Sequence, residues 1–145
     1  MADVERFGVF LPSYIWAGDG AERARGIKAF ARQVELGFDS LFITDHLLAA
    51  KRFYSVSFLE PLSALAVAAG ATERVRLGTS ILIMPLRNPV MLAKELATLQ
   101  FLSENRMILG AGVGWNEQEY AALGVQKSER GKRTDEMLDI LIPLL

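Results

Sequence analysis

The only histidine of the chain, His46, follows Asp45 directly after a short apolar run at residues 40–44. A neutral imidazole at such a point accepts a proton from an alcohol or donates a hydrogen bond to a reduced cofactor. The neighbouring carboxylate of Asp45 would then fix the orientation of the ring. A structural role also fits, with Asp45 capping a turn and His46 as a hydrogen-bonded surface side chain. These two residues alone leave both interpretations open.

Two further apolar runs end in small residues, which let a flat ring approach the backbone closely. The candidates for contact with such a ring are Thr79, Ser80, Ile81, Gly112, Val113, Gly114 and Trp115. The alternating glycines do not make a dinucleotide-binding loop, whose third glycine comes three positions after the second and opens a long helix. A bulge or tight packing would give the same pattern, so a structural role is the alternative.

A carboxylate, Glu117, follows the second of these runs. It is either a charged group near a substrate or an exposed acid in the first turn of a short helix, which is the commoner role. Asn116 and Glu119 have the spacing of a capping box. This spacing predicts a short helix that continues through residue 122.

The elements that must position these residues follow a regular order. Apolar runs at residues 7–12, 40–44, 75–83 and 107–112 predict strands that begin about 33, 35 and 32 residues apart, the length of one βα unit. Helical spacing follows at residues 21–36, 61–71, from 89 onward, 116–122 and from 128 onward, where Met137, Leu138, Leu141 and Leu145 should point inward. We therefore expect an α/β fold with parallel strands. Periodicity alone leaves an open sheet and an arc of a barrel as alternatives.

The composition excludes several classes of protein. A net charge of −1 offers no general attraction for nucleic acid, and the absence of cysteine, with one histidine, argues against disulfides and a metal site. Asp3 and Glu5 stand where a signal peptide would be basic, and the apolar run at residues 75–84 is too short to cross a bilayer. We expect a cytoplasmic protein that acts on a small-molecule substrate, without nucleic acid or membrane.

Four βα units are half of an eight-unit barrel, and the chain stops inside or just after its last helix. We therefore expect one barrel domain, cut short, over residues 1–145. Its first and fourth strands would have unpaired edges, and the inward faces of its strands would lack cover. This predicts a homodimer or a partner that supplies the second half-barrel.

The longer motifs resemble the bacterial luciferase-like family across nearly the whole chain. They are FGVFLP, ELGFDSLFITDH, ERVRLGTSILIMPLRNPVMLAKELATLQFLS, and NRMILGAGVGWNEQEYAALGV followed by ERG. The likeness is greatest to the subgroup assigned to coenzyme F420 rather than to flavin mononucleotide (FMN). The resemblance implies a (β/α)8 barrel of the TIM type, often dimeric, with a flavin-like ring at the carboxyl ends of the strands.

The resemblance also implies roles for single residues. His46 matches a histidine beside the ring, and Ser80-Ile81 matches a cis peptide bond that supports one ring face. Glu117 matches a carboxylate near the substrate in related sugar-phosphate dehydrogenases. An aromatic residue that those dehydrogenases carry shortly after the histidine is missing from residues 47–50, so their substrate is not carried over.

Three functions follow as hypotheses. The first is an oxidoreductase that moves a hydride between an organic substrate and coenzyme F420, with His46 as general acid or base and Glu117 as its proton partner. The second is an FMN-dependent monooxygenase. The third is a non-catalytic half-barrel that acts through self-association.

Overall fold

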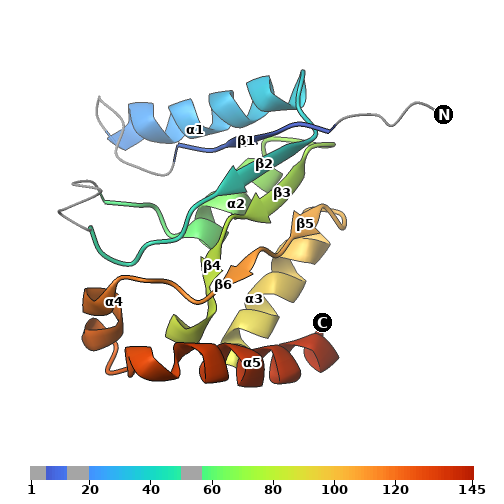
Figure 1. Ribbon diagram of the computed structural model, residues 1–145. Coiled ribbons are helices and arrows are strands. Elements are labelled where there is room, and N and C mark those ends of the chain that lie inside the picture. The colour runs from blue at the N-terminus through green and yellow to red at the C-terminus, as the bar shows by residue number, and fades with distance from the viewer. Residues whose placement is uncertain (1–5, 13–19, 50–56) are drawn as a thin grey trace.

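The computed structural model describes residues 6–12, 20–49 and 57–145, so the acidic start of the chain lies outside the described residues. The main sheet has four parallel strands in the order β1-β2-β3-β5. These strands are β1 (Gly8–Phe10), β2 (Ser40–Ile43), β3 (Arg76–Thr79) and β5 (Met107–Ile108). The parallel α/β fold predicted from the alternating pattern is confirmed (Figure 1).

Two of the expected strands are each divided into two. After β3 the chain passes through a cis peptide bond between Ser80 and Ile81 and resumes as β4 (Leu82–Ile83). The fourth run resumes as β6 (Ala111–Gly112), which pairs with β4 in a separate two-stranded parallel sheet. The cis peptide bond expected from the resemblance is confirmed, whereas the single strand expected over residues 75–83 is wrong.

The hydrogen bonds around Ser80 explain this division. The Ser80 N–H donates to the Ile43 carbonyl of β2 (2.8 Å), whereas the Leu82 N–H donates to the Gly110 carbonyl in the next unit (2.7 Å). The Thr79 hydroxyl donates to the Gly110 carbonyl and accepts from the Gly110 N–H, both at 3.0 Å. Thr79 therefore fills the place where the regular hydrogen-bond ladder between the two strands is interrupted.

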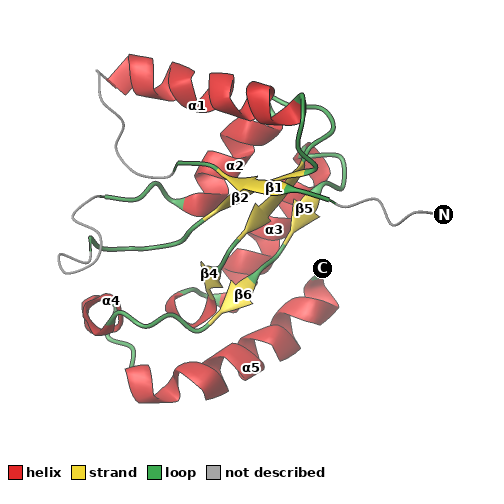
Figure 2. Cartoon of the chain, turned by 45° about the horizontal axis from the view of Figure 1, so that its top comes forward, coloured by secondary structure: helices red, strands yellow, loops and turns green. Residues whose placement is uncertain are grey.

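Helices cover one face of the main sheet. In the described part of the chain they are α1 (Gly20–Glu35), α2 (Pro61–Ala69), α3 (Pro89–Leu102), α4 (Glu117–Ala122) and α5 (Arg130–Leu141). Figure 2 shows α2 and α3 behind the strands and α1 at the top of the view, where it contacts α2 and β2. Helix α5 packs against α3 and the short turn Met84–Leu86. The opposite face, which would be the inside of a barrel, carries no helix of the described residues.

The start of α3 follows the predicted capping pattern. The side-chain oxygen of Asn88 accepts hydrogen bonds from the N–H groups of Val90 (3.0 Å) and Met91 (3.1 Å). Pro89 occupies the first helical position, where a missing N–H costs nothing. The residues that begin the third helix were therefore predicted correctly.

The end of the last helix differs from the expectation. Met137 and Leu141 are buried as predicted, but α5 stops at Leu141, and Leu145 is 62% exposed. The chain continues as a 3-10 turn, Ile142–Leu144. Pro143 has no N–H to extend the α-helical hydrogen bonds, so the helical face predicted for Leu145 is lost.

The two faces of the sheet are packed differently. The strand residues completely buried under the helices are Leu41, Ile43 and Leu77. On the other face Phe42 lies across Gly8 and Gly78, where a Cβ atom would come within 2.8 and 2.4 Å of the Phe42 ring. The two glycines therefore make room for one large aromatic side chain inside the half-barrel.

Glu35 holds the loop that leads into β3. Its Oε1 accepts hydrogen bonds from the backbone N–H groups of Glu73 (2.8 Å), Arg74 and Val75 (3.1 Å). Burial acts to raise the pKa of the Glu35 carboxyl, but these three donors and the charge of Arg106 outweigh it. The pKa therefore lies below its ordinary value of 4.5.

We expect Glu35→Gln to lower the free energy of unfolding by about 1 kcal/mol near pH 7, because an amide oxygen is a weaker acceptor than a carboxylate. A depressed pKa in the folded state means that this stabilisation is present above the unfolded pKa and is lost as the pH falls through the folded pKa. Urea unfolding at about pH 7 and about pH 3 measures the difference. The exposed Glu136→Gln is the control, and a Glu35→Gln effect of equal size at both pH values would contradict the prediction.

Candidate active site

The carboxyl ends of β2, β4 and β6 lie on one side of the molecule, toward α4 (Figure 1). A cleft of about 110 Å³ opens there. Its walls are formed by Thr44, Asp45, His46, Ser80, Ile81, Ile83, Gly114 and Trp115. Three motifs far apart in the sequence therefore converge at the end of the strands where parallel α/β proteins bind ligands.

Six of the residues selected from the sequence line this cleft: Asp45, His46, Ser80, Ile81, Gly114 and Trp115. Four others lie outside its walls. Thr79 is buried at the break between the two sheets, and Gly112 packs under the Ile81 side chain. Val113 is 39% exposed, and Glu117 is exposed in the first turn of α4.

Glu119 was expected to complete a capping box, and the structure shows it bound to the histidine instead. Its Oε1 lies 3.0 Å from His46 Nδ1 and accepts hydrogen bonds from the N–H groups of Leu47 (2.8 Å) and Leu48 (3.1 Å). The Glu119 side chain is completely buried, and the His46 side chain is 10% exposed. Asn116 does cap α4 as expected, so only the reciprocal half of the capping box is wrong.

Asp45 connects the second βα unit to the third. Its Oδ2 accepts hydrogen bonds from the Ile83 N–H (2.9 Å) and from the Arg87 guanidinium (3.1 Å). The contact that orients His46 is with Glu119, whereas Asp45, which was expected in that role, holds the end of β4 at Ile83. Asp45 therefore fixes the backbone of Ile83, which is another wall residue of the cleft.

Arg87 is held between two carboxylates, since it also binds Glu60 at 3.2 Å. Burial acts to raise the pKa of Glu60, but hydrogen bonds from Ser63 and Leu62 and the charge of Arg87 outweigh it. The pKa of Glu60 therefore lies below its ordinary value, and this side chain is ionised near neutral pH. Glu60 is also the N-cap of α2, so the ion pair fixes Arg87 to the start of a helix.

Two aromatic rings surround the imidazole of His46. The Phe58 ring centroid lies 5.1 Å away, and the Trp115 ring approaches edge-on at 5.5 Å. A second cavity of about 300 Å³ shares Asp45 and His46 with the cleft. Its other walls are Leu47, Phe58, Glu60, Pro61, Leu86, Arg87 and Leu123. The imidazole therefore lies on the boundary between two cavities.

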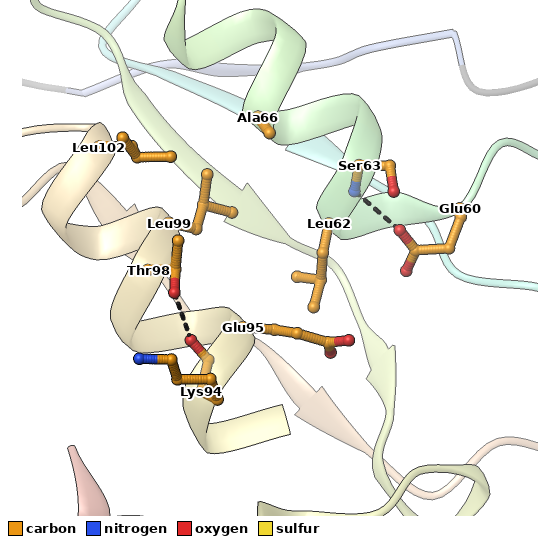
Figure 3. A pocket seen from close by; sticks show the side chains of 9 residues that line it. All are labelled: Glu60, Leu62, Ser63, Ala66, Lys94, Glu95, Thr98, Leu99 and Leu102. Carbon is orange, nitrogen blue, oxygen red and sulfur yellow. Dashed lines mark hydrogen bonds between the residues drawn. The ribbon is translucent and has the colours of Figure 1, made fainter. Parts of the chain in front are cut away.

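A groove of about 290 Å³ lies between α2 and α3 (Figure 3), and it shares Glu60 with the second cavity but neither Asp45 nor His46. Leu62 of α2 and Leu99 of α3 are among its walls, together with the exposed side chains of Lys94 and Glu95. None of the residues predicted to do chemistry lines it. The groove is therefore a feature of the outer helical layer and not of the candidate active site.

The cleft fits one side of a flat ring system. The side chains of Ile81 and Trp115 are 38% and 46% exposed, which gives it an apolar wall, and His46 adds a polar group. Its volume is below the 300–1,000 Å³ that is roughly typical of small-molecule sites, so these residues would hold only part of a cofactor.

Within the described ranges we find no group of three metal-ligating side chains. None of the helices in these ranges has the length and the apolar character that a membrane span requires.

Parallel strands covered by helices on one face, with a cleft at their carboxyl ends, are the arrangement of a (β/α) barrel, in which that end of the strands carries the active site. Residues 5–145 match the family model described as luciferase-like monooxygenase. The chain belongs to this family, whose members are oxidoreductases and monooxygenases.

Two curated relatives match along most of the chain. The 4-hydroxyprotoasukamycin monooxygenase of Streptomyces nodosus subsp. asukaensis is 30% identical over 141 residues, and the limonene 1,2-monooxygenase of Rhodococcus erythropolis is 28% identical over 141 residues. Each alignment covers 96% of this chain but only 37% and 35% of the relative, respectively. The chain thus spans little more than a third of the length of these enzymes.

Solved structures share the fold. The monooxygenase RslO1 of Streptomyces bottropensis superposes with a TM-score of 0.82 at 26% identity, over 94% of this chain and 42% of its own. The oxygenating constituent of 3,6-diketocamphane monooxygenase from Pseudomonas putida, solved with FMN, gives 0.79 at 22% identity, over 95% and 38%. An F420-dependent secondary alcohol dehydrogenase, solved with an F420-acetone adduct, gives 0.77 at 23% identity, over 94% and 41%. The half-barrel predicted from four βα units is confirmed by this partial coverage.

We expect Asp45→Ala to lower the free energy of unfolding by about 2 to 4 kcal/mol, because it leaves the Ile83 N–H and the Arg87 guanidinium without their shared acceptor. Chemical denaturation followed by circular dichroism measures this loss. The exposed Asp135→Ala in α5 is the matched control and should change stability by less than about 0.5 kcal/mol. Equal stability of the two variants would show that the Asp45 contacts contribute nothing.

Proposed function

We propose that this chain forms the N-terminal half of an oxidoreductase active site in which an organic substrate reacts on a deazaflavin or flavin ring. The observation that carries the proposal is the position of His46. It lines the cleft at the carboxyl ends of the strands, and its Nδ1 binds a buried carboxylate, which is the arrangement of a proton-transferring histidine.

The residues of the chain would bind, orient and transfer protons. The apolar wall formed by Ile81 and Trp115 would bind one ring face and exclude water from it, while His46 would accept or donate the proton of a substrate hydroxyl group. When bound, coenzyme F420 supplies the hydride chemistry. Glu117 is exposed on α4 and does not line the cleft. Its role as a second proton-transferring group stays a prediction.

We favour hydride exchange with coenzyme F420 over the other chemistries. Removal of a hydride from an alcohol carbon also releases the hydroxyl proton, and a paired histidine is suited to accept it. The F420-dependent secondary alcohol dehydrogenase of the same fold makes small secondary alcohols reasonable first probe substrates. An FMN-dependent monooxygenase is the second candidate, and it is favoured by the similarity to 4-hydroxyprotoasukamycin monooxygenase and limonene 1,2-monooxygenase.

We further propose that residues outside this chain complete the barrel, supplied by a second copy or by a partner segment. The inner face and the mouth of the half-barrel expose large apolar side chains, which are Phe10 (51%), Trp115 (46%), Val113 (39%) and Ile81 (38%). The solved structures that share this fold are more than twice as long as the matched region. A (β/α) half-barrel needs such a cover because its strands have helices on one face only.

The cofactor is tested with the complete protein by titrating F420 and FMN separately and following the absorption spectrum of each ring. We expect F420 to bind more tightly, and F420 to be reduced when a small secondary alcohol is added. The reverse order of affinities, with oxygen consumed in the presence of reduced FMN, would replace this proposal with the monooxygenase.

His46→Ala should lower turnover by about a hundredfold to ten-thousandfold, which is the usual contribution of a positioned general acid or base. Cofactor affinity should change much less, because the imidazole is only one of several groups in the wall of the cleft. Glu95→Gln, on the outer helical layer, should match the wild type in both measurements. Near-normal turnover of His46→Ala would leave His46 with a structural role only.

Sedimentation velocity at micromolar concentration tests the need for a cover. We expect residues 1–145 alone to form dimers or larger species, because exposed apolar surface costs about 25 cal/mol per Å². A stable monomer with cooperative unfolding would mean that loops of the same chain cover the inner face.

A further inference from the structure

We propose that Glu119 is a positioning residue for His46, and that it holds the imidazole in the tautomer with the proton on Nδ1. The inference rests on the proposed function only for its effect on turnover. The tautomer itself follows from hydrogen bonding within the chain. The sequence pattern assigned Glu119 to a capping box, and the residue roles implied by the family resemblance do not include it.

The hydrogen bonds at Oε1 of Glu119 decide the direction of the bond to the ring. This oxygen already accepts from the N–H groups of Leu47 at 2.8 Å and Leu48 at 3.1 Å. A proton on the same oxygen would point at one of these donors or take the place of one. The oxygen is therefore an acceptor throughout, and His46 Nδ1, 3.0 Å away, must donate its proton to it.

Fixing the proton on Nδ1 determines the chemistry of the other ring nitrogen. In a neutral imidazole one nitrogen carries the proton and the other carries the lone pair, so Nε2 becomes the basic atom. The same carboxylate also fixes the backbone that follows His46, and the rings of Phe58 and Trp115 restrict the tilt of the imidazole. Glu119 thus specifies both the position of the ring and which of its nitrogens can accept a proton.

The burial of Glu119 supports a dedicated role for its contact with His46. Its side chain is completely buried, and its other oxygen, Oε2, has no hydrogen-bond partner among the described residues. A buried carboxylate is costly unless it is hydrogen-bonded, so it persists where a particular contact is needed. Here that contact joins α4 to a loop 73 residues earlier in the chain.

Because His46 is the only histidine, the tautomer can be read directly from the protein labelled with [15N]histidine. Where raising the pH no longer changes the two 15N signals, we expect the Nδ1 signal to be that of a protonated ring nitrogen and the Nε2 signal that of an unprotonated one. A ring with its proton on Nε2 would overturn the proposal without the use of any variant.

Turnover provides the second measurement. Glu119→Ala should release the tautomer preference and lower kcat at least about tenfold, by no more than His46→Ala does, with little change in KM. Glu119→Gln keeps an acceptor oxygen, so it should retain the Nδ1–H tautomer and recover part of kcat even if the alanine variant folds poorly. Glu95→Gln is the matched control on an exposed helix surface.

The outcomes separate the two proposals. If both Glu119 variants keep the wild-type tautomer and kcat, Glu119 does not position the histidine. If His46→Ala keeps normal turnover while the labelled ring shows the Nδ1–H tautomer, the proposed function fails and the positioning contact stands.

Discussion

The structure depends on charged side chains of one βα unit that bind the backbone of another. Loop N–H and C=O groups have no partner in a helix or sheet, so they need acceptors and donors from elsewhere. Glu119 and Asp45 supply acceptors at the carboxyl ends of the strands. At the opposite end Glu35 accepts from the loop before β3, and the Arg106 guanidinium donates to the carbonyls of Ala69, Thr72 and Val75. These contacts determine how neighbouring units fit together.

Local signals in the sequence were sufficient for most of the fold. Asn88 and Pro89 mark a helix start through contacts within four residues, and the strand pattern depends on burial of every side chain that faces a helix. The break at Ser80 is different. It arises because the backbone N–H groups donate to Ile43 of β2 before the break and to Gly110 of the fourth unit after it. Apolar residues lie on both sides of this change, so the apolar pattern does not mark it. The small residues there allowed a bulge, but only the family resemblance pointed to a cis peptide bond.

The candidate site was also predicted only where its signals are local in the sequence. His46 was found because its type and its place after a strand are local properties. Glu119 was assigned to a capping box, because a capping box joins residues only three positions apart. Its actual partner, His46, is 73 residues away. One signal was available. The spacing of Asn116, Glu119 and Tyr120 places them on one face of the short helix, away from Glu117. The structure shows that this face is buried, so an acid on it needs a partner inside the protein.

The proposed chemistry is divided between this half-barrel, which holds His46 and Glu119, and the residues that would complete the barrel. His46, which would transfer the proton, and Glu119, which positions it, are both in this chain and are in contact, so their geometry does not depend on other residues. The ring-binding surface is different, because the cleft of about 110 Å³ provides one wall and leaves Trp115 nearly half exposed. A half-barrel of this kind can therefore be organised for proton transfer before its cofactor site is complete. Under the proposed function, the residues that complete the barrel would add cofactor affinity and substrate selection to a histidine that Glu119 already positions.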